Sequence, residues 1–338
     1  PHLDRQYTAY GKVVKGMEKI FITGITGQDG LFLTSKLLRH RDIKIYGCSR
    51  DLQASSFYKK LELLNAVDTI NLKIVSLDLL NLTEITTFVK DVRPDVIVNL
   101  SGPSSVYESI RDNRKSYNEI TSIYQNLNDA VMKNNLKPII FQASSSEMFK
   151  KNDSGIFDEN SQLEGLTPYA EAKIKNHQKS IKLNKDLGLK TYSGIMFNHE
   201  SEFRENAYLI MQIINSAKKI SMNKGGTFTI GSLDLERDWS FAGDVAEAIL
   251  QIINNGKSNS YVIGSGVGKS IKEVVQIIFQ YFGLEYEEFL VLDATRNRKN
   301  NIKKIVSNPA KIKKELGWKS NMILEDLIVR CIEKKFKD

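Results

Sequence analysis

The sequence predicts an α/β fold, in which a doubly wound parallel sheet is followed by a smaller C-terminal α/β domain. Apolar runs of strand length alternate with stretches of helical spacing, and these runs lie at 19–23, 43–48, 72–77, 95–100 and 139–143. The run at 95–100 is apolar almost throughout, which is typical of a strand buried on both faces of a parallel sheet. A third observation, a glycine-rich turn after the first run, places the start of the fold.

That turn contains three glycines spaced three apart, Gly24, Gly27 and Gly30, and a helical pattern begins directly after them. A strand, a glycine turn and a helix form the first unit of a Rossmann-type nucleotide-binding fold. Glycines let the backbone approach a pyrophosphate, and the helix N-terminus points its N–H groups at the anion. The spacing is GxxGxxG rather than GxGxxG, so the prediction of a bound dinucleotide depends on the position of the turn after the first strand.

Composition excludes several classes of protein. The chain has 338 residues, enough for one large or two modest domains, and 41% of them are hydrophobic, enough for a full core. The net charge of +8 comes from interspersed acids and bases, which favours a solvated surface over a nucleic-acid interface. Cys48 and Cys331 lie far apart and form no metal or redox motif. With no apolar run of membrane-spanning length, we expect a cytoplasmic protein without nucleic-acid, membrane or metal partners.

The patterns also suggest a division of the chain. Residues 1–16 lack the apolar core of a signal peptide, and Met17 stands just before the first strand. We interpret residues 1–16 as the remnant of a fusion and leave them out of the functional argument. Residues 17–195 are expected to form mainly the dinucleotide-binding domain. Residues 196–338 are expected to form mainly the substrate-binding domain, interleaved so that the chain returns to the large sheet.

Polar residues at strand ends are candidate contacts of the dinucleotide, because ligands of doubly wound sheets lie there. Arg50 after the second strand suits a 2′-phosphate and Asp51 suits a free 2′-hydroxyl, so NADP and NAD both stay open at this point. Asp78 after the third strand either holds an adenine amino group or caps the next helix. The fourth strand opens into a small polar loop, residues 101–106.

A second set of polar residues suggests catalysis. The fifth strand ends in three serines and Glu147, and Tyr169 and Lys173 follow on one helical face at i, i+4. A Tyr and a Lys four apart occur by chance on many helices, but here they follow a glycine turn and a serine cluster. An ammonium beside a phenol favours the phenolate and is expected to lower the Tyr169 pKa from about 10 toward neutrality. Tyr169 would then be a base for an alcohol proton.

With these features the chain resembles the extended short-chain dehydrogenase/reductase superfamily and, within it, the GDP-mannose 4,6-dehydratase family. The resemblance runs from about Met17 to the end, and its most specific segments are 24–30, 142–149, 197–201 and 237–239. It implies a hydro-lyase that converts GDP-mannose to GDP-4-keto-6-deoxymannose by internal hydride transfer through bound NADP, with NAD less expected. It also implies a homodimer or homotetramer.

The resemblance assigns roles residue by residue. Ser145 would hydrogen-bond the sugar 4-hydroxyl and Tyr169 would take its proton. Lys173 would hold the nicotinamide ribose, and Glu147 would remove the proton from carbon 5. The residues expected to contact the cofactor are Gly24, Gly27, Gln28, Asp29, Gly30, Arg50, Asp78, Leu79, Leu100, Ser101, Ser104, Tyr169, Lys173, His199 and Arg204. Those expected to contact the substrate are Ser104, Ser145, Asn198, Arg237 and Arg298.

Departures from the family pattern leave other substrates and reactions open. They fall in the expected substrate pocket and cofactor loop, at Asp51, Pro103, Ser105, Met211, Gln212 and Lys299. One alternative is a dehydratase for another GDP-linked sugar, such as GDP-manno-heptose. Another is a nucleotide-sugar reductase or epimerase, although a simple reductase needs no base such as Glu147. A catalytically retired member acting as a redox sensor or interaction subunit is disfavoured by the intact catalytic set.

Overall fold

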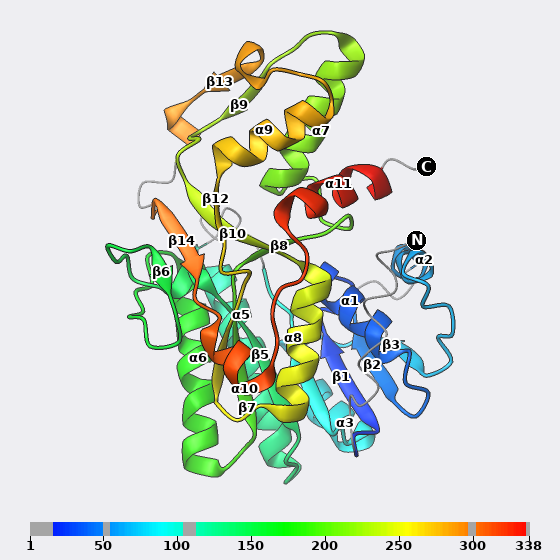
Figure 1. Cartoon of the computed structure of the whole chain (residues 1–338). Coiled ribbons are helices and arrows are strands. Elements are labelled where there is room, and N and C mark those ends of the chain that lie inside the picture. Colours follow the sequence, from blue (N-terminus) through cyan, green and yellow to red (C-terminus); the bar gives the residue numbers. More distant parts are fainter. Residues whose placement is uncertain (1–15, 50–54, 104–112, 297–301, 336–338) are drawn as a thin grey trace.

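A parallel sheet of seven strands forms the centre of the large lobe in the computed structural model, which describes residues 16–49, 55–103, 113–296 and 302–335 (Figure 1). In spatial order the strands are β11 (Ser260–Ile263), β7 (Thr191–Met196), β5 (Ile139–Ser145), β4 (Val96–Asn99), β1 (Lys19–Thr23), β2 (Lys44–Cys48) and β3 (Leu72–Val75). All six neighbouring pairs are parallel. The predicted doubly wound α/β fold is confirmed.

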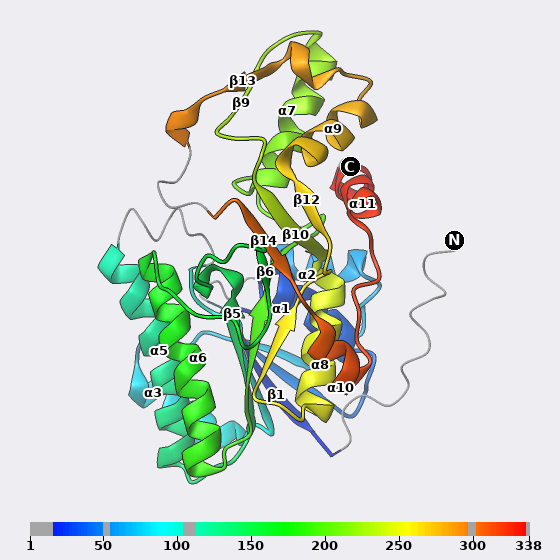
Figure 2. The same ribbon diagram turned by 60° about the vertical axis from the view of Figure 1, so that its left-hand side comes forward.

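The two faces of this sheet are covered by different helices because side chains alternate along each strand. Ile20 and Ile22 pack with one core, toward α1 (Gln28–Leu37) and α8 (Ala242–Asn255). Phe21 points the other way, into a second core with α3 (Leu82–Val92) and α5 (Asn113–Lys133). The α6 helix (Pro168–Leu187) packs against α5, and Figure 2 shows the two lying side by side. Both faces being apolar explains why the strands read as nearly continuous hydrophobic runs.

The strand order reverses between β1 and β4, and their carboxyl ends form the switch point where ligands of such sheets bind. Gly24 follows β1 there with φ +68°, in the left-handed region. A Cβ at this position would lie 2.9 Å from the carbonyl carbon of Leu100, which follows β4. The glycine therefore allows the β1 turn to approach the end of β4.

A smaller lobe lies above the large sheet in Figure 1. Its main sheet has the order β12 (Gly268–Ser270), β10 (Glu236–Phe241), β14 (Lys304–Ser307), β6 (Ile156–Phe157), and β8 (Asn198–Glu200) pairs with β10. A separate pair joins β9 (Phe228–Ile230) to β13 (Leu290–Leu292). Helices α7 (Leu209–Asn223), α9 (Ile271–Tyr281) and α11 (Leu324–Lys335) complete the lobe, while α2 (Ser55–Leu63) and α10 (Ala310–Leu316) lie lower. The chain returns to the large sheet through α8 and β11.

Three local expectations differ from the structure. The third strand ends at Val75 rather than at residue 77, and the fifth continues to Ser145, so that two of the three serines lie within it. The interpretation of Asp78 as a helix cap is wrong, because Asn81 caps α3 by accepting from the Thr83 and Glu84 amides. Among the described residues, no helix is long and apolar enough to cross a bilayer.

Candidate active site

The glycine turn leads directly into α1. Gly27 precedes the first helical residue, and its amide donates to the Gly24 carbonyl at 3.1 Å. Gly30 lies in the first turn of α1, where a Cβ would be 2.4 Å from the carbonyl oxygen of Ile25. The first turn of α1 thus packs on the glycine turn with no space for a side chain, and the N-terminus of α1 faces the switch point. This cradle fits the pyrophosphate of a dinucleotide.

The first turn of α1 is fastened to β8 by side chains, in what we call the α1–β8 latch (Gln28, Asp29, His199 and Ser201). Gln28 Nε2 donates to the carbonyl oxygen of His199 at 3.0 Å, and Ser201 Oγ donates to Gln28 Oε1 at 2.9 Å. His199 Nε2 lies 2.9 Å from Asp29 Oδ1. The latch brings together cofactor residues predicted from two distant segments.

Charges in and beside the latch reinforce one another. Burial disfavours the charge on His199, but the Asp29 carboxylate outweighs burial and raises the pKa of the imidazole. Burial likewise opposes the charge on Asp29, yet His199, Arg204 and Lys173 together lower its pKa. Each group therefore favours the charged form of the other. Arg204 lies 3.4 Å from Glu200 and its guanidinium stacks 3.4 Å from the ring centroid of Tyr208.

The predicted catalytic residues converge at the carboxyl end of β5. Tyr169 lies in the first turn of α6, which Thr167 begins by accepting from the Ala170 amide at 3.1 Å. Its hydroxyl hydrogen-bonds Ser145, the last residue of β5. Glu147 follows in a single 3₁₀ turn, donates its amide to Ser145 Oγ at 3.2 Å and exerts its charge on Tyr169. The Ser145 hydroxyl thus joins Tyr169, the candidate base for the 4-hydroxyl, to the segment that carries Glu147, the candidate base for carbon 5.

Lys173 stands one turn further along α6. Its ammonium donates to the carbonyl oxygen of Ala143 at 3.0 Å and lies 5.5 Å from the ring centroid of Tyr169. The expected lowering of the Tyr169 pKa is wrong for this structure, because burial raises the pKa of Tyr169 to about 12. Burial also lowers the pKa of Lys173 to about 8, against the opposing influence of Asp29. Desolvation is the largest influence on the pKa of each group.

The remaining predicted cofactor contacts that the structure describes lie at neighbouring strand ends. Asp78 and Leu79 follow β3, and the Asp78 side chain accepts from the Leu80 amide at 2.9 Å. Leu100 and Ser101 follow β4, beside the glycine turn. Three predicted contacts lie outside the described residues, namely Arg50, Ser104 and Arg298. No cluster of metal-ligating side chains occurs within the described ranges.

The predicted substrate residues Asn198 and Arg237 belong to the small lobe. Asn198 begins β8 and is aligned with Trp239 of β10. Arg237 is nearly buried, and its Nη1 donates to the carbonyl oxygens of Glu236 and Lys303 at 2.8 and 3.3 Å. These two hydrogen bonds fix the position of the Arg237 guanidinium beside the paired strands β10 and β14.

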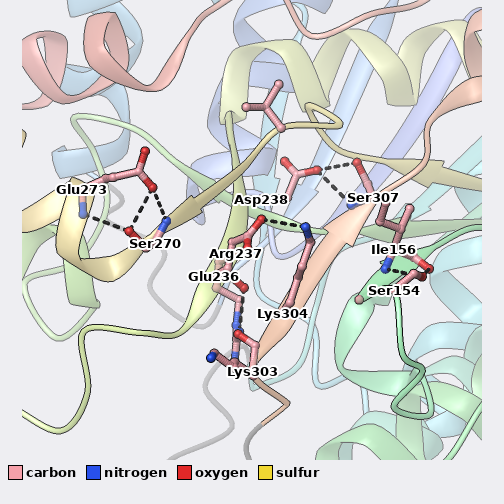
Figure 3. Close-up of polar contacts among 12 residues, drawn as sticks. Ser154, Ile156, Glu236, Arg237, Asp238, Ser270, Glu273, Lys303, Lys304 and Ser307 are labelled. Atoms are coloured by element: carbon pink, nitrogen blue, oxygen red, sulfur yellow. Dashed lines mark hydrogen bonds and ion pairs between the residues drawn. The ribbon is translucent and has the colours of Figure 1, made fainter.

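Next to Arg237, the sequence analysis missed a buried hub at Asp238 (Figure 3). The carboxylate is fully buried and accepts from the amide of Ser265 at 2.8 Å, the amide of Gly266 at 2.9 Å and the amide of Ser307 at 3.1 Å. The Ser265 and Ser307 hydroxyls also donate to it. Because the donors come from β14 and from the loop before β12, the Asp238 carboxylate joins both of these segments to β10, next to Arg237. The sequence analysis singled out the segment 237–239 but assigned no role to Asp238, its middle residue.

A family model described as GDP-mannose 4,6 dehydratase matches residues 21–331. The chain belongs to the GDP-mannose 4,6-dehydratase family. It is therefore an enzyme of hydro-lyase type, as predicted.

Among curated family members, GDP-mannose 4,6 dehydratase 1 of Arabidopsis thaliana is 27% identical, over 95% of this chain and 90% of its own length. Solved structures share the fold at lower identity. DesIV, a dTDP-glucose 4,6-dehydratase from Streptomyces venezuelae with NAD and TYD bound, is 21% identical with a TM-score of 0.79, covering 93% of this chain and 95% of its own. RMD from Pseudomonas aeruginosa complexed with NADPH is 17% identical with a TM-score of 0.75, covering 95% and 100%.

Two of the residues that depart from the family pattern, Met211 and Gln212, differ in burial. Met211 is fully buried in the core of α7, as its place in an apolar stripe predicts. Gln212 is exposed and donates to the Ala207 carbonyl at 2.7 Å. These two departures are thus one core residue and one surface residue. Tyr208, which precedes α7 and stacks on Arg204, was not singled out by the sequence analysis.

Proposed function

We propose that the chain is a GDP-mannose 4,6-dehydratase that converts GDP-mannose to GDP-4-keto-6-deoxymannose with a bound NADP. The observation that carries this proposal is the convergence of Ser145, Glu147, Tyr169 and Lys173 at the carboxyl end of β5, beside the glycine cradle of α1. A dehydrogenase needs only the hydroxyl, the phenol and the ammonium. Glu147 adds a carboxylate to this group, and a carboxylate is what removal of a proton from carbon 5 requires.

The chain's own residues divide the reaction between them. Ser145 Oγ orients the sugar 4-hydroxyl beside the Tyr169 hydroxyl. Tyr169 takes the proton from that hydroxyl as carbon 4 is oxidised, and the resulting ketone acidifies the proton at carbon 5. Glu147 removes this proton and, as its conjugate acid, protonates the departing 6-hydroxyl as water. A bound nicotinamide would supply the hydride acceptor for carbon 4 and the hydride donor for carbon 6, and carbon 5 regains a proton that balances the one taken by Tyr169.

The residues that would hold the cofactor fit a dinucleotide. Gly24 and Gly30 leave the backbone of the turn without side chains, and the α1 N-terminus supplies N–H groups to a pyrophosphate. Lys173 would reach the nicotinamide ribose. NADP is proposed over NAD because Arg50 suits a 2′-phosphate through its permanent charge and planar donors, against the opposing Asp51.

The test is a substrate panel with purified enzyme. GDP-mannose, GDP-manno-heptose, dTDP-glucose and UDP-glucose are each incubated with the enzyme, and mass spectrometry detects the loss of one water. We expect GDP-mannose to lose water without net consumption of cofactor, since the hydride is returned. Turnover of GDP-manno-heptose alone would favour the alternative sugar. Stoichiometric oxidation or reduction of added cofactor without loss of water would favour a reductase.

The same preparation tests the remaining proposals. Denaturation releases the tightly held cofactor, and chromatography then distinguishes NADP from NAD. We propose a homodimer or homotetramer in the cytoplasm, and light scattering measures the mass of the assembly. The Ser145→Ala and Glu147→Gln variants, each assayed separately, provide the inactive controls for the panel.

A further inference from the structure

The three residues that follow β8, which we call the β8 turn (residues 201–203), contact two different helices. Ser201 donates its hydroxyl to Gln28 Oε1 at 2.9 Å. The ring centroid of Phe203 lies 5.7 Å from that of Phe32, and both Gln28 and Phe32 belong to α1. Glu202, between them, contacts α11 instead. The β8 turn is therefore held by the helix of the glycine cradle on one side and by the C-terminal helix on the other.

The partner of Glu202 is Arg330 of α11. The guanidinium donates from Nε to Oε2 at 2.9 Å and from Nη2 to Oε1 at 2.5 Å, so both carboxylate oxygens are engaged. The Glu202 side chain is only 3% exposed. A planar guanidinium that meets a carboxylate at two points fixes its orientation as well as its charge. Arg330 therefore determines where the buried Glu202 carboxylate lies.

The same guanidinium packs on an aromatic cluster that contacts α1. The Arg330 Cζ atom lies 4.8 Å from the ring centroid of Phe241, the last residue of β10. Phe241 in turn meets Phe32 of α1 edge-on, with centroids 5.0 Å apart, and both rings are buried. Arg330 thus contacts two residues that pack on α1 or are joined to residues that do.

These contacts connect the two lobes. α11 belongs to the small lobe, whereas α1 covers the sheet of the large lobe (Figure 1). Gln28 is the first residue of α1 and follows Gly27 of the glycine cradle. The N–H groups expected to face a pyrophosphate lie in this first turn, so their direction depends on how the turn is held. The contacts of Arg330 therefore lead to the part of α1 that matters for a dinucleotide.

We propose that Arg330 is a positioning residue for dinucleotide binding. By holding Glu202, it fixes the β8 turn against the first turn of α1 and so orients the glycine cradle. The inference rests on the proposed binding of a dinucleotide at this cradle, but not on the identity of the sugar. It gives the C-terminal helix a role in cofactor affinity, although Arg330 is not one of the predicted cofactor contacts.

The test is the affinity of the full chain, freed of bound cofactor, for NADPH and for NADH, each titrated separately by nicotinamide fluorescence. Arg330→Lys keeps a positive charge beside Glu202 but loses the two-point contact. We expect it to raise the dissociation constant of the preferred cofactor by about fivefold or more, as for other coupled sites. Glu202→Gln combined with Arg330→Gln removes both charges, leaves neither unpaired and should have the same effect. Circular dichroism establishes that each variant is folded.

Glu325→Gln is the matched control on the same helix. It removes the 3.2 Å ion pair with Lys269, which ties α11 to β12 rather than to the β8 turn. We expect its dissociation constant to equal that of wild type. An equal rise in this control would indicate a general loosening of α11 and overturn the proposal. Unchanged affinity in both folded Arg330 variants would overturn it as well.

A double-mutant cycle separates positioning through the β8 turn from an independent effect on folding. Ser201→Ala removes the hydrogen bond to Gln28 and should itself weaken cofactor binding. If Arg330 acts through the same turn, the combination with Arg330→Lys weakens binding by less than the product of the two single effects. Single effects that multiply in full would contradict the proposal.

The titrations also distinguish failure of this inference from failure of the proposed function. A wild-type enzyme that binds neither NADPH nor NADH would overturn the proposed function and this inference with it. Wild-type binding together with unchanged affinity in the variants would overturn this inference alone. Because no sugar is present, the result is independent of the substrate panel.

Discussion

Lys173 and Tyr169 stand one helical turn apart, yet the Lys173 ammonium is hydrogen-bonded to the Ala143 carbonyl at 3.0 Å, while the Tyr169 hydroxyl bonds to Ser145. The Lys173 ammonium and the Tyr169 hydroxyl therefore have different hydrogen-bond partners. At neutral pH Tyr169 is a neutral phenol and Lys173 is charged, since their pKa values are about 12 and about 8. Tyr169 can accept the 4-hydroxyl proton only as the phenolate, so its role as the base requires additional positive charge close to the phenol that lowers its pKa.

Replacing Tyr169 with Phe should block the first step. Without the phenol, no side chain accepts the 4-hydroxyl proton, so hydride transfer from carbon 4 stops as well. Rapid mixing with GDP-mannose should show no transient absorbance of reduced cofactor, whereas wild-type enzyme should show it. Bound-cofactor content and thermal stability provide the controls for folding. Cofactor reduction at the wild-type rate in this variant would assign the base to another residue.

Glu147→Gln should keep the fold and the bound cofactor but lose dehydration. A carboxamide cannot accept the carbon 5 proton, and loss of a general base typically costs about 10²–10⁴-fold in rate. Oxidation at carbon 4 should persist, so cofactor reduction on mixing distinguishes this variant from Tyr169→Phe. The amount of 4-keto-6-deoxy product is the deciding measurement, and near-normal turnover would remove Glu147 from its assigned role.

Arg50→Ala should weaken NADP binding and leave NAD binding little changed. The guanidinium offers donors in a planar fork that matches a phosphate, whereas the neighbouring Asp51 suits a free 2′-hydroxyl and opposes the preference. Dissociation constants of both cofactors for wild type and variant decide the point. An equal loss for both, or a wild-type preference for NAD, would mean that Asp51 reads the ribose.

Much of the fold could be predicted from the sequence because the central strands are apolar on both faces. Side chains such as Ile20 and Phe21 pack into opposite cores, so strand positions appear as runs of hydrophobic residues. The grouping of Ser145 with Tyr169 and Lys173 was also predictable, since strand ends and the i, i+4 rule place them near one edge.

Other features depend on contacts between distant segments and could not be predicted. The direction of the Tyr169 pKa depends on how completely α6 is buried, which spacing does not reveal. A buried polar ladder runs from Thr23 through Asn99 to Gln142, each linked at 2.7 Å across adjacent strands, and no periodicity indicates it. The donors to Asp238 likewise come from a distant strand and a loop whose positions only the folded chain defines.

Gly30→Ala should destabilise the enzyme and impair cofactor binding. The added Cβ would lie 2.4 Å from the Ile25 carbonyl oxygen and 2.5 Å from its Cα, both backbone atoms that cannot move aside without shifting the glycine turn. Such overpacking typically costs about 1–3 kcal/mol. Gly225→Ala is the matched control, because a Cβ there meets nothing within 4 Å. Urea unfolding and cofactor titration of both variants test this, and equal stability of the two would refute it.

His177 should make the enzyme sensitive to acid. This histidine of α6 is 5% exposed and its Nδ1 lies 2.8 Å from Ser193 Oγ of β7. Burial lowers its pKa from 6.5 to about 4. Between these values the unfolded chain binds a proton that the folded chain does not, so stability is full above pH 6.5 and is lost progressively as the pH falls toward 4.

The expected loss from this one group is about 2 kcal/mol between pH 7 and pH 5, from about 1.4 kcal/mol per pKa unit. His177→Gln retains a side chain that can hydrogen-bond Ser193 but does not titrate, so its free energy of unfolding should fall less over the same interval. His40→Gln, which changes a half-buried histidine outside this contact, should follow wild type. Urea unfolding at the two pH values measures the difference, and parallel losses in wild type and His177→Gln would show that other groups control the acid response.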